Sequence, residues 1–339
     1  MISFRNDYSE IAHPRIIEKL LECATQQNDG YGLDLHSRSA ADSIRRLLGR
    51  DADIHFIPGG TQTNLLTIAA CLRPFECVLT CDTGHINVHE TGAIEGTGHK
   101  VVTVPHVNGK LTPDGIRSMV RVHTDEHMVK PRMVYLSDST ELGTLYTKAE
   151  LTAIRAVCDE LGLLLFLDGA RLGSALCSAQ NDLTLIDLAT LCDVFYAGGT
   201  KNGAMFGEAL VILHDGLKTD FRYMIKNRGA MLAKGFVTGI QFEVLFEGDT
   251  PLYFELAAHA NRQANRIADA LVQKGYPFYA TPAGTNQLFP IVSKDKLAAL
   301  EQEFAFNVEK PLPDGRFAIR FVTSWATTDG MVDALIAAL

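Results

Sequence analysis

The sequence predicts an α/β fold in which helices cover both faces of a mainly parallel sheet. Short runs rich in apolar and β-branched residues recur along the chain, and helix-like stretches separate most of them. Strands that are apolar on both faces and joined through helices are typical of a parallel sheet buried between two helical layers. The runs are IHFIP (54–58), CVLT (77–80), VVTVP (101–105), MVYLS (133–137), LLLFLD (163–168), VFYAG (194–198) and EALVIL (208–213).

One connecting helix has clear signals at both ends. Thr147 and Glu150 have the spacing of a capping box, LTAIRAVCDEL has helical periodicity, and Gly162 follows it. We therefore expect a helix that ends at Gly162 and leads directly into the strand at 163–168.

The pattern changes after about residue 236. A long helical stretch, two isolated strands (QLFPIV and FAIRFVT) and a final amphipathic helix (DGMVDALIAAL) follow. Together with the N-terminal helix RIIEKLLECATQ they suggest a smaller α+β domain. We expect residues 1–30 to pack with this small domain, residues 31–235 to form the large domain and residues 236–339 to form the small one.

The composition argues against several classes of protein. The net charge of −9, without a cluster of Lys or Arg, disfavours a nucleic-acid partner. The sequence contains no run of 18 apolar residues, so we expect no membrane span. The start MISFRNDYSEIAHPR lacks the pattern of a secretory signal. The 7 cysteines are scattered, mostly in apolar stretches, which is typical of reduced thiols. We expect a cytoplasmic protein.

Ligands of parallel α/β sheets bind beyond the carboxyl ends of the strands, and one such end is IHFIPGGTQTN. Gly60 and Thr61 stand where a helix begins, and backbone N–H groups beside small residues and a hydroxyl suit a phosphate. A tight turn without a ligand is the alternative. The spacing matches neither a Walker loop nor a dinucleotide fingerprint, so nucleotide binding is disfavoured.

A second strand end is LLLFLDGARL, where Asp168 follows an apolar run. A carboxylate at the inner end of a buried strand is costly unless a cation faces it. Arg171 is one possible partner, and the nitrogen of a pyridinium ring is another.

The third strand end is YAGGTKNGA, with Lys201 among small residues. A phosphate site, a strand-end aspartate and a lysine in a glycine-rich loop together match the needs of pyridoxal 5'-phosphate: an anchor, a partner for the ring nitrogen and an amine for a Schiff base. The small neighbours would leave room for a flat ring.

The fourth strand end is CDTGHINVHETGA. His85 could stack on a ring or move protons near neutral pH. His85 and His89 are one helical turn apart, but no third ligand stands at a recognisable spacing, so we expect no metal.

The chain resembles the low-specificity L-threonine aldolases, a family of β-eliminating lyases. That family belongs to fold type I of the pyridoxal-phosphate enzymes. The resemblance therefore implies an aspartate-aminotransferase-like three-layer fold. It extends through nearly the whole chain and rests on NDYSEIAHPRI, GYGLD, GGTQTN, HINVHETGAIE, STELGTLYT, LDGARLGSAL, GGTKNG and RFVTSWATT.

The resemblance implies roles around the cofactor. Lys201 would attach it covalently, and Asp168 would pair with its ring nitrogen. Gly60 and Thr61 would bind its phosphate, and His85 would stack over the ring.

The resemblance also implies a substrate site. Arg171 looks like the family arginine near the ring oxygen and the substrate carboxylate, and Arg320 looks like the arginine that binds that carboxylate. Asn6 would lie among the substrate-binding residues. Tyr31 would enter the site of a neighbouring subunit, because such enzymes are homodimers or homotetramers with shared sites.

Two positions depart from the family pattern. Many members read SerAsp where this chain has Asn6 and Asp7, and many carry a histidine where Glu141 stands. The group that takes the proton of the substrate's β-hydroxyl could therefore be His85, a water that it activates, or Glu141.

The activity that the resemblance implies is the cleavage of β-hydroxy-α-amino acids, such as L-threonine, L-allo-threonine or phenylserine, to glycine and an aldehyde. Another β-eliminating lyase or an aminotransferase would use the same residues, and so would a non-catalytic protein that binds the cofactor.

Overall fold

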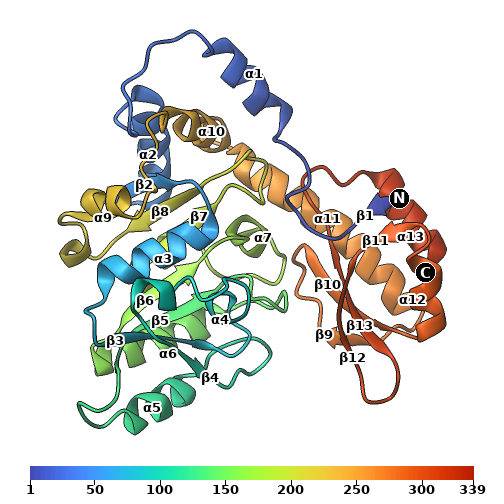
Figure 1. Ribbon diagram of the computed structural model, residues 1–339. Coiled ribbons are helices and arrows are strands. Elements are labelled where there is room, and N and C mark those ends of the chain that lie inside the picture. Colours follow the sequence, from blue (N-terminus) through green and yellow to red (C-terminus); the bar gives the residue numbers. More distant parts are fainter.

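The computed structural model describes residues 1–339 as two parts joined by a long helix (Figure 1). The larger part contains a seven-stranded sheet in the order β2-β8-β7-β6-β5-β3-β4. Strand β8 runs antiparallel to both β2 and β7, and the other neighbouring pairs are parallel. The predicted mainly parallel sheet is confirmed. Its strands are β2 (Asp53–Ile57), β3 (Glu76–Cys81), β4 (Val101–Val104), β5 (Lys130–Ser137), β6 (Leu164–Asp168), β7 (Val194–Gly198) and β8 (Glu208–Ile212).

Alternate side chains of the sheet build two separate cores. Leu165 and Leu167 of β6 pack with α2, α5, α6 and α8, whereas Leu164 and Phe166 pack with α3 and α9. This alternation buries both faces of the sheet and explains why its strands are continuously apolar. The helices are α2 (Leu35–Leu48), α3 (Gly60–Cys71), α5 (Pro113–Val122), α6 (Lys148–Leu161), α8 (Leu185–Leu191) and α9 (Phe221–Asn227).

Short helical turns lie in the loops of the larger part. They are α4 (His85–Val88), η1 (Glu95–Thr97), α7 (Leu172–Leu176) and η2 (Asp215–Leu217).

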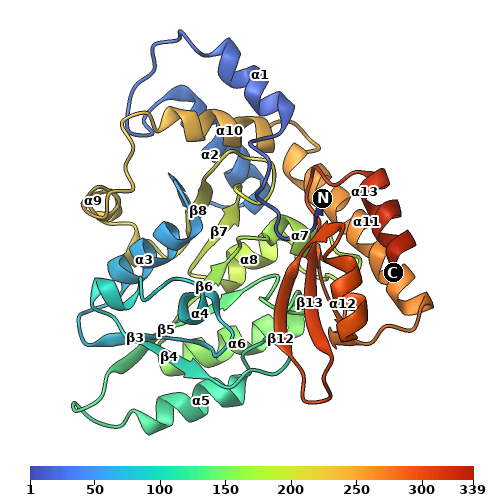
Figure 2. The same cartoon turned by 45° about the vertical axis from the view of Figure 1, so that its right-hand side comes forward.

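The smaller part has its own core between three helices and an antiparallel sheet, whose order is β12-β13-β10-β9. Figure 2 shows β12, β13 and α12 together in the smaller part. The elements are α11 (Leu252–Gln273), β9 (Phe278–Ala280), β10 (Gln287–Val292), α12 (Lys294–Leu300), β11 (Phe304–Ala305), β12 (Asn307–Pro311), β13 (Phe317–Val322) and α13 (Asp329–Ala338).

The N-terminal segment touches both parts. Strand β1 (Ile2–Ser3) pairs with β11 of the smaller part, whereas α1 (Pro14–Glu22) packs on α10 (Phe236–Phe246). Helix α10 in turn packs on α2 of the larger part. The boundary expected near residue 236 therefore stays a prediction. None of the helices combines the length and apolar character that crossing a membrane requires.

The predicted capping box of α6 is confirmed. The backbone N–H of Glu150 donates to Thr147 Oγ1 over 3.2 Å, and that of Thr147 donates to Glu150 Oε2 over 2.8 Å. Gly162 ends the helix in the left-handed conformation, with a φ of 65°.

We expect Thr147→Ala to lower the free energy of unfolding by about 1 kcal/mol, because one helix-terminal N–H loses its partner. Urea denaturation followed by circular dichroism measures this change. Thr124→Ala, in an exposed loop, is the control and should change stability by less than about 0.5 kcal/mol. Equal stability of Thr147→Ala and wild type would contradict the capping role.

Candidate active site

Three of the predicted site residues lie at the carboxyl edge of the central sheet. Asp168 is the last residue of β6, and Lys201 follows β7 in a turn. Gly60 opens α3 just after β2. The strands are parallel here, so their ends meet at one edge.

Asp168 is buried and accepts hydrogen bonds without forming an ion pair. Its Oδ2 accepts from Asn64 Nδ2 over 3.1 Å and from the hydroxyl of Tyr135, and its Oδ1 accepts from the Ala170 N–H over 2.9 Å. Burial raises the pKa of Asp168, but the positive charge that His85 carries when it is protonated and the hydroxyls of Tyr135 and Tyr196 outweigh this effect, and the pKa is lowered. The carboxylate thus stays ionised with no cation in contact.

The alternative that Arg171 neutralises Asp168 is wrong. Arg171 instead forms a two-bond ion pair with Asp7, Nε to Oδ2 at 2.7 Å and Nη2 to Oδ1 at 3.0 Å. Asn286 Nδ2 also donates to Asp7 Oδ2 over 2.9 Å. Burial raises the pKa of Asp7, but Arg171 and Lys201 outweigh it, and the pKa is lowered. Because Asp7 occupies one edge of the guanidinium, Nη1 of Arg171 remains for a ligand.

Lys201 lies beside this pair and lines a small cavity with Asp7, Arg171 and Asn286. Its amine makes no hydrogen bond or ion pair. Burial lowers the pKa of Lys201, and the positive charge of Arg171 adds to this effect. A lysine with a lowered pKa is more often a neutral amine, which is the nucleophilic form.

The glycines before Lys201 serve the packing of the chain. A Cβ atom on Gly198 would lie 2.5 Å from the carbonyl oxygen of Ala170, and one on Gly199 would lie 2.7 Å from the ring of Phe242. We expected the small neighbours of Lys201 to leave room for a flat ring, but at these two glycines protein atoms fill the space.

A buried glutamate fixes the turn that carries Lys201. Glu208 accepts from Thr200 Oγ1 over 2.8 Å and from the Gly199 N–H over 3.0 Å. Burial raises the pKa of Glu208 to about 7. Gly60 stands nearby, since a Cβ atom there would lie 3.9 Å from Glu208 Oε1 and 3.5 Å from the hydroxyl of Tyr196.

Gly60 and Thr61 occupy the first turn of α3. The residue before them, Gly59, supplies no side-chain cap. The N–H groups that open this helix are therefore free to bind an anion.

His85 begins α4 and contacts two glutamates. Its Nδ1 lies 2.8 Å from Glu90 Oε1, and its backbone N–H donates to Glu141 Oε1 over 2.9 Å. Burial raises the pKa of Glu141. The rings of His85 and His89 are 5.4 Å apart, and no group of three His, Cys, Asp or Glu side chains is arranged to hold a metal ion.

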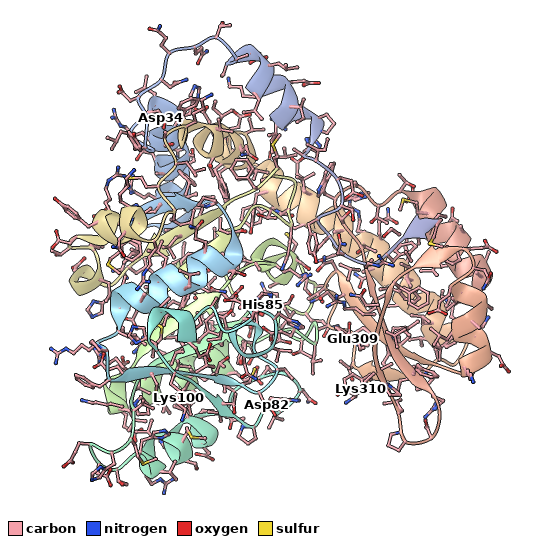
Figure 3. The ribbon with its side chains drawn as sticks, viewed as in Figure 1. Asp34, Asp82, His85, Lys100, Glu309 and Lys310 are labelled. Carbon is pink, nitrogen blue, oxygen red and sulfur yellow. The ribbon has the colours of Figure 1, made fainter.

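Arg320 faces this region from the smaller part. It lies on β13, with its Nε 3.2 Å from Glu309 Oε1 of β12, and its terminal nitrogens form no hydrogen bond. Burial lowers the pKa of Arg320. An open groove beside it is lined by Glu309 and by His89 of the larger part. Figure 3 shows His85 and Glu309 on the facing sides of the two parts.

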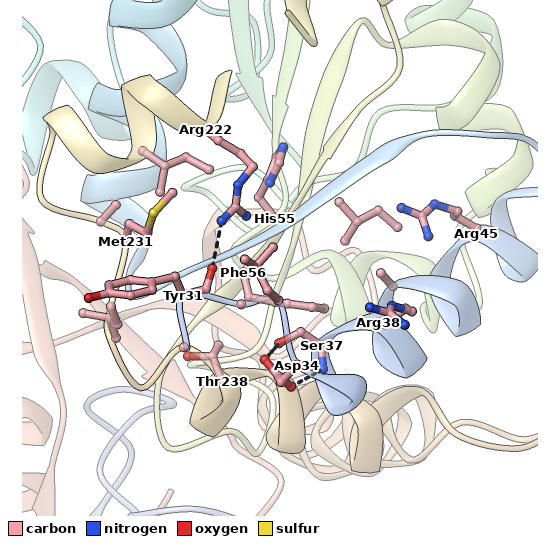
Figure 4. Close-up of a pocket in the computed structure, with 18 residues that line it drawn as sticks. Tyr31, Asp34, Ser37, Arg38, Arg45, His55, Phe56, Arg222, Met231 and Thr238 are labelled. Atoms are coloured by element: carbon pink, nitrogen blue, oxygen red, sulfur yellow. Dashed lines mark hydrogen bonds between the residues drawn. The ribbon is translucent and has the colours of Figure 1, made fainter. Parts of the chain in front are cut away.

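Neither Asn6 nor Tyr31 lines the small cavity that contains Lys201. Asn6 accepts from the Tyr8 N–H over 3.0 Å and from Ser9 Oγ over 2.9 Å, so its oxygen holds the local turn. Tyr31 lines a second pocket of about 210 Å³ (Figure 4), where Arg222 donates to its carbonyl oxygen over 3.1 Å. Tyr31 is 46% exposed.

The sequence is similar to known proteins over most of its length. A family model described as beta-eliminating lyase matches residues 5–322. The chain belongs to the β-eliminating lyase family. This family and its fold depend on pyridoxal 5'-phosphate.

Two relatives of the lyase are similar over most of their length. The low-specificity L-threonine aldolase of Pseudomonas aeruginosa is 32% identical over 324 residues, which cover 95% of this chain and 92% of the relative. The structure of a threonine aldolase from Leishmania major is 50% identical, with a TM-score of 0.97, and the match covers 99% of this chain and 98% of that one. The structure of an aspartate aminotransferase from Thermus thermophilus is 15% identical, with a TM-score of 0.71, and the match covers 100% of this chain and 90% of that one. This similarity confirms the predicted fold class.

Several residues of the lyase's site were absent from the sequence prediction, among them Glu208, Asn286 and the four that follow. Asp7, Asn64 and Glu90 are polar residues buried by tertiary contacts, and Tyr135 lies inside an apolar strand. Asp7 and Glu90 stand within motifs that carry the family resemblance, and Asn64 ends GGTQTN, so these motifs were the available signal.

We expect Asp7→Asn to lower the free energy of unfolding by about 3 kcal/mol, because Arg171 would stay buried without its counter-charge. The folded-state pKa of Asp7 is lowered, so the ion pair stabilises the protein above the unfolded value of 3.8 and this stabilisation is lost as the pH falls through the folded value. Denaturation at about pH 7 and below pH 4 measures both effects.

The control for this change is Asp29→Asn, an exposed aspartate of the same N-terminal segment. It should alter stability by less than about 0.5 kcal/mol at either pH. An equally small effect of Asp7→Asn would show that the ion pair contributes no net stability.

Proposed function

We propose that the protein is a pyridoxal-phosphate-dependent aldolase that cleaves β-hydroxy-α-amino acids to glycine and an aldehyde. One observation carries the proposal: an unpaired lysine amine, Lys201, shares a sheet edge with a buried carboxylate, Asp168, that has no cation in contact. Similarity to threonine aldolases over nearly the full chain supports the choice of reaction.

The buried charges of the site match those of pyridoxal phosphate. Two carboxylates, Asp168 and Glu90, are buried close together, and His85 is the only basic side chain that contacts either. A buried anion needs a counter-charge, and a protonated ring nitrogen would supply it at Asp168. Lys201 would attach the cofactor, and the first N–H groups of α3, at Gly60 and Thr61, would hold its phosphate.

The bound cofactor supplies an acceptor for the electron pair of the broken Cα–Cβ bond. The chain supplies the rest. Arg320 presents two free terminal nitrogens, which match a carboxylate in two bonds, and Arg171 can add Nη1. Holding the carboxylate fixes the orientation of the amino acid, which determines which bond at Cα breaks.

We further propose that the enzyme is a cytoplasmic homodimer or homotetramer in which Tyr31 completes a neighbouring site. Tyr31 is exposed and lines a different cavity from Lys201, and Leu33 and Leu35 near it in the sequence are 56% and 71% exposed. Exposed apolar side chains at alternate positions of one short segment are suited to contact with another subunit. Sedimentation velocity would test the assembly.

The deciding experiment is product analysis with L-threonine, L-allo-threonine and β-phenylserine. We expect equal amounts of glycine and aldehyde from the protein loaded with pyridoxal phosphate, and no turnover by Lys201→Ala. Pyruvate or an oxo acid would instead indicate a β-eliminating lyase or an aminotransferase. A coloured protein that is inert toward all three substrates would indicate a binding protein.

We expect Arg320→Lys to raise KM about tenfold and to change kcat less, because an ammonium group cannot make paired bonds to a carboxylate. Steady-state kinetics with the best substrate measures both constants. Arg316→Lys is the matched control, since Arg316 lies just before β13 and pairs with Asp314 at an exposed position. An unchanged KM in Arg320→Lys would assign the carboxylate to other residues.

A further inference from the structure

A buried glutamate holds the ring of His85. Glu90 Oε1 lies 2.8 Å from His85 Nδ1, and the side chain of Glu90 is 0% exposed. An ionised carboxylate can only accept hydrogen bonds, so Nδ1 must carry the hydrogen of this contact. A neutral ring with its hydrogen on Nδ1 has an unprotonated Nε2, which is then the acceptor.

The environment of Glu90 indicates that it is an acceptor. Asn64 Nδ2 donates to Glu90 Oε1 over 2.7 Å and to Asp168 Oδ2 over 3.1 Å. One amide group thus donates to two buried carboxylates, and the hydroxyl oxygen of Tyr135 lies 3.3 Å from the same nitrogen. Asn64 is fully buried, so it cannot exchange these partners for water. This arrangement leaves the hydrogen between His85 and Glu90 on the histidine.

The backbone of His85 is held as well. Helix α4 has no side-chain cap at Gly84, and Glu141 Oε1 accepts the His85 N–H in its place. The same oxygen accepts from Ser137 Oγ over 2.6 Å. Glu141 therefore already uses one oxygen to position α4. By contrast, His85 Nε2 has no partner, and the side chain is 33% exposed.

We propose that Glu90 is a positioning residue that keeps neutral His85 protonated on Nδ1, so that Nε2 accepts the β-hydroxyl proton of the substrate. This inference rests on the proposed function. The hydroxyl proton would move to Nε2, and the O–H electron pair would form the carbonyl bond of the aldehyde. The electron pair of the Cα–Cβ bond would remain with Cα, and the bound cofactor would supply the acceptor for it. Glu90 balances the charge of the imidazolium, which then returns a proton for the new C–H bond of glycine.

The tautomer of His85 can be measured without turnover. Histidine-selective ¹⁵N labelling and long-range ¹H–¹⁵N correlation spectra at pH 8 distinguish the two neutral forms, and His85→Asn identifies the signal. We expect the Nδ1–H form in wild type and a shift toward the Nε2–H form in Glu90→Leu, which removes the acceptor. A wild-type ring that is charged, or protonated on Nε2, would overturn the proposal.

Kinetics test the role in catalysis. Glu90→Gln keeps an amide oxygen for His85 but removes the charge that balances the imidazolium. We expect kcat to fall about tenfold in Glu90→Gln and about a hundredfold in Glu90→Leu, with KM changed less than about threefold. Glu95→Gln, an exposed glutamate of the same segment, should keep kcat within about twofold. Full kcat in Glu90→Gln would overturn the proposal.

The two proposals fail in different ways. If wild type releases glycine and aldehyde but Glu90→Gln is fully active, the aldolase function stands and the role of Glu90 is refuted. If wild type cleaves none of the substrates, the function is refuted, and the spectra still decide whether Glu90 sets the tautomer. The side chain of glutamine has nearly the same shape as that of glutamate. Glu90→Gln therefore still tests the proposal if Glu90→Leu does not fold.

Discussion

The organisation of the site depends on one buried negative charge, the carboxylate of Asp168 at the end of β6. Burial raises the pKa of this carboxyl, but the charge of a protonated His85 and nearby hydrogen bonds lower it. Three hydrogen-bond donors contact the carboxylate: Asn64 on α3, Tyr135 on β5 and the N–H of Ala170. No side-chain cation makes contact with it. The protein therefore presents an ionised acceptor that a positively charged ligand would complete.

The same constraint explains why the neighbouring polar groups form a network. Asn64 connects Asp168 to Glu90, and Glu90 connects to the ring of His85. His85, the proton acceptor that we propose, is thus connected to Asp168, which would accept the ring N–H of the cofactor. The connection runs through Glu90 and the buried amide of Asn64. Buried networks of this kind fix donor and acceptor directions, because an unpaired polar group would be costly.

The N-terminal segment joins the two parts at the site. Asp7 pairs with Arg171 of the larger part and also accepts from Asn286 of the smaller part. Arg320 approaches from the smaller part with its terminal nitrogens free. A substrate bound between them would touch both parts, so the relative position of the parts controls how the substrate is held.

The sequence alone determined the seven strands of the central sheet, the capped helix α6 and the order of the strand-end motifs, because apolar runs, capping and strand-end chemistry are local properties. The short strands β1, β9, β11 and β12 were not predicted. The sequence also placed Asp168, Lys201 and Gly60 at one sheet edge, since parallel strands bring their carboxyl ends together. Only the tertiary structure decided that Arg171 pairs with Asp7, and that Asn64 and Glu90 join Asp168 to His85. Except for His85 and Glu90, which are five residues apart, these contacts join residues distant in the chain. No local periodicity records which distant polar group will meet a buried charge.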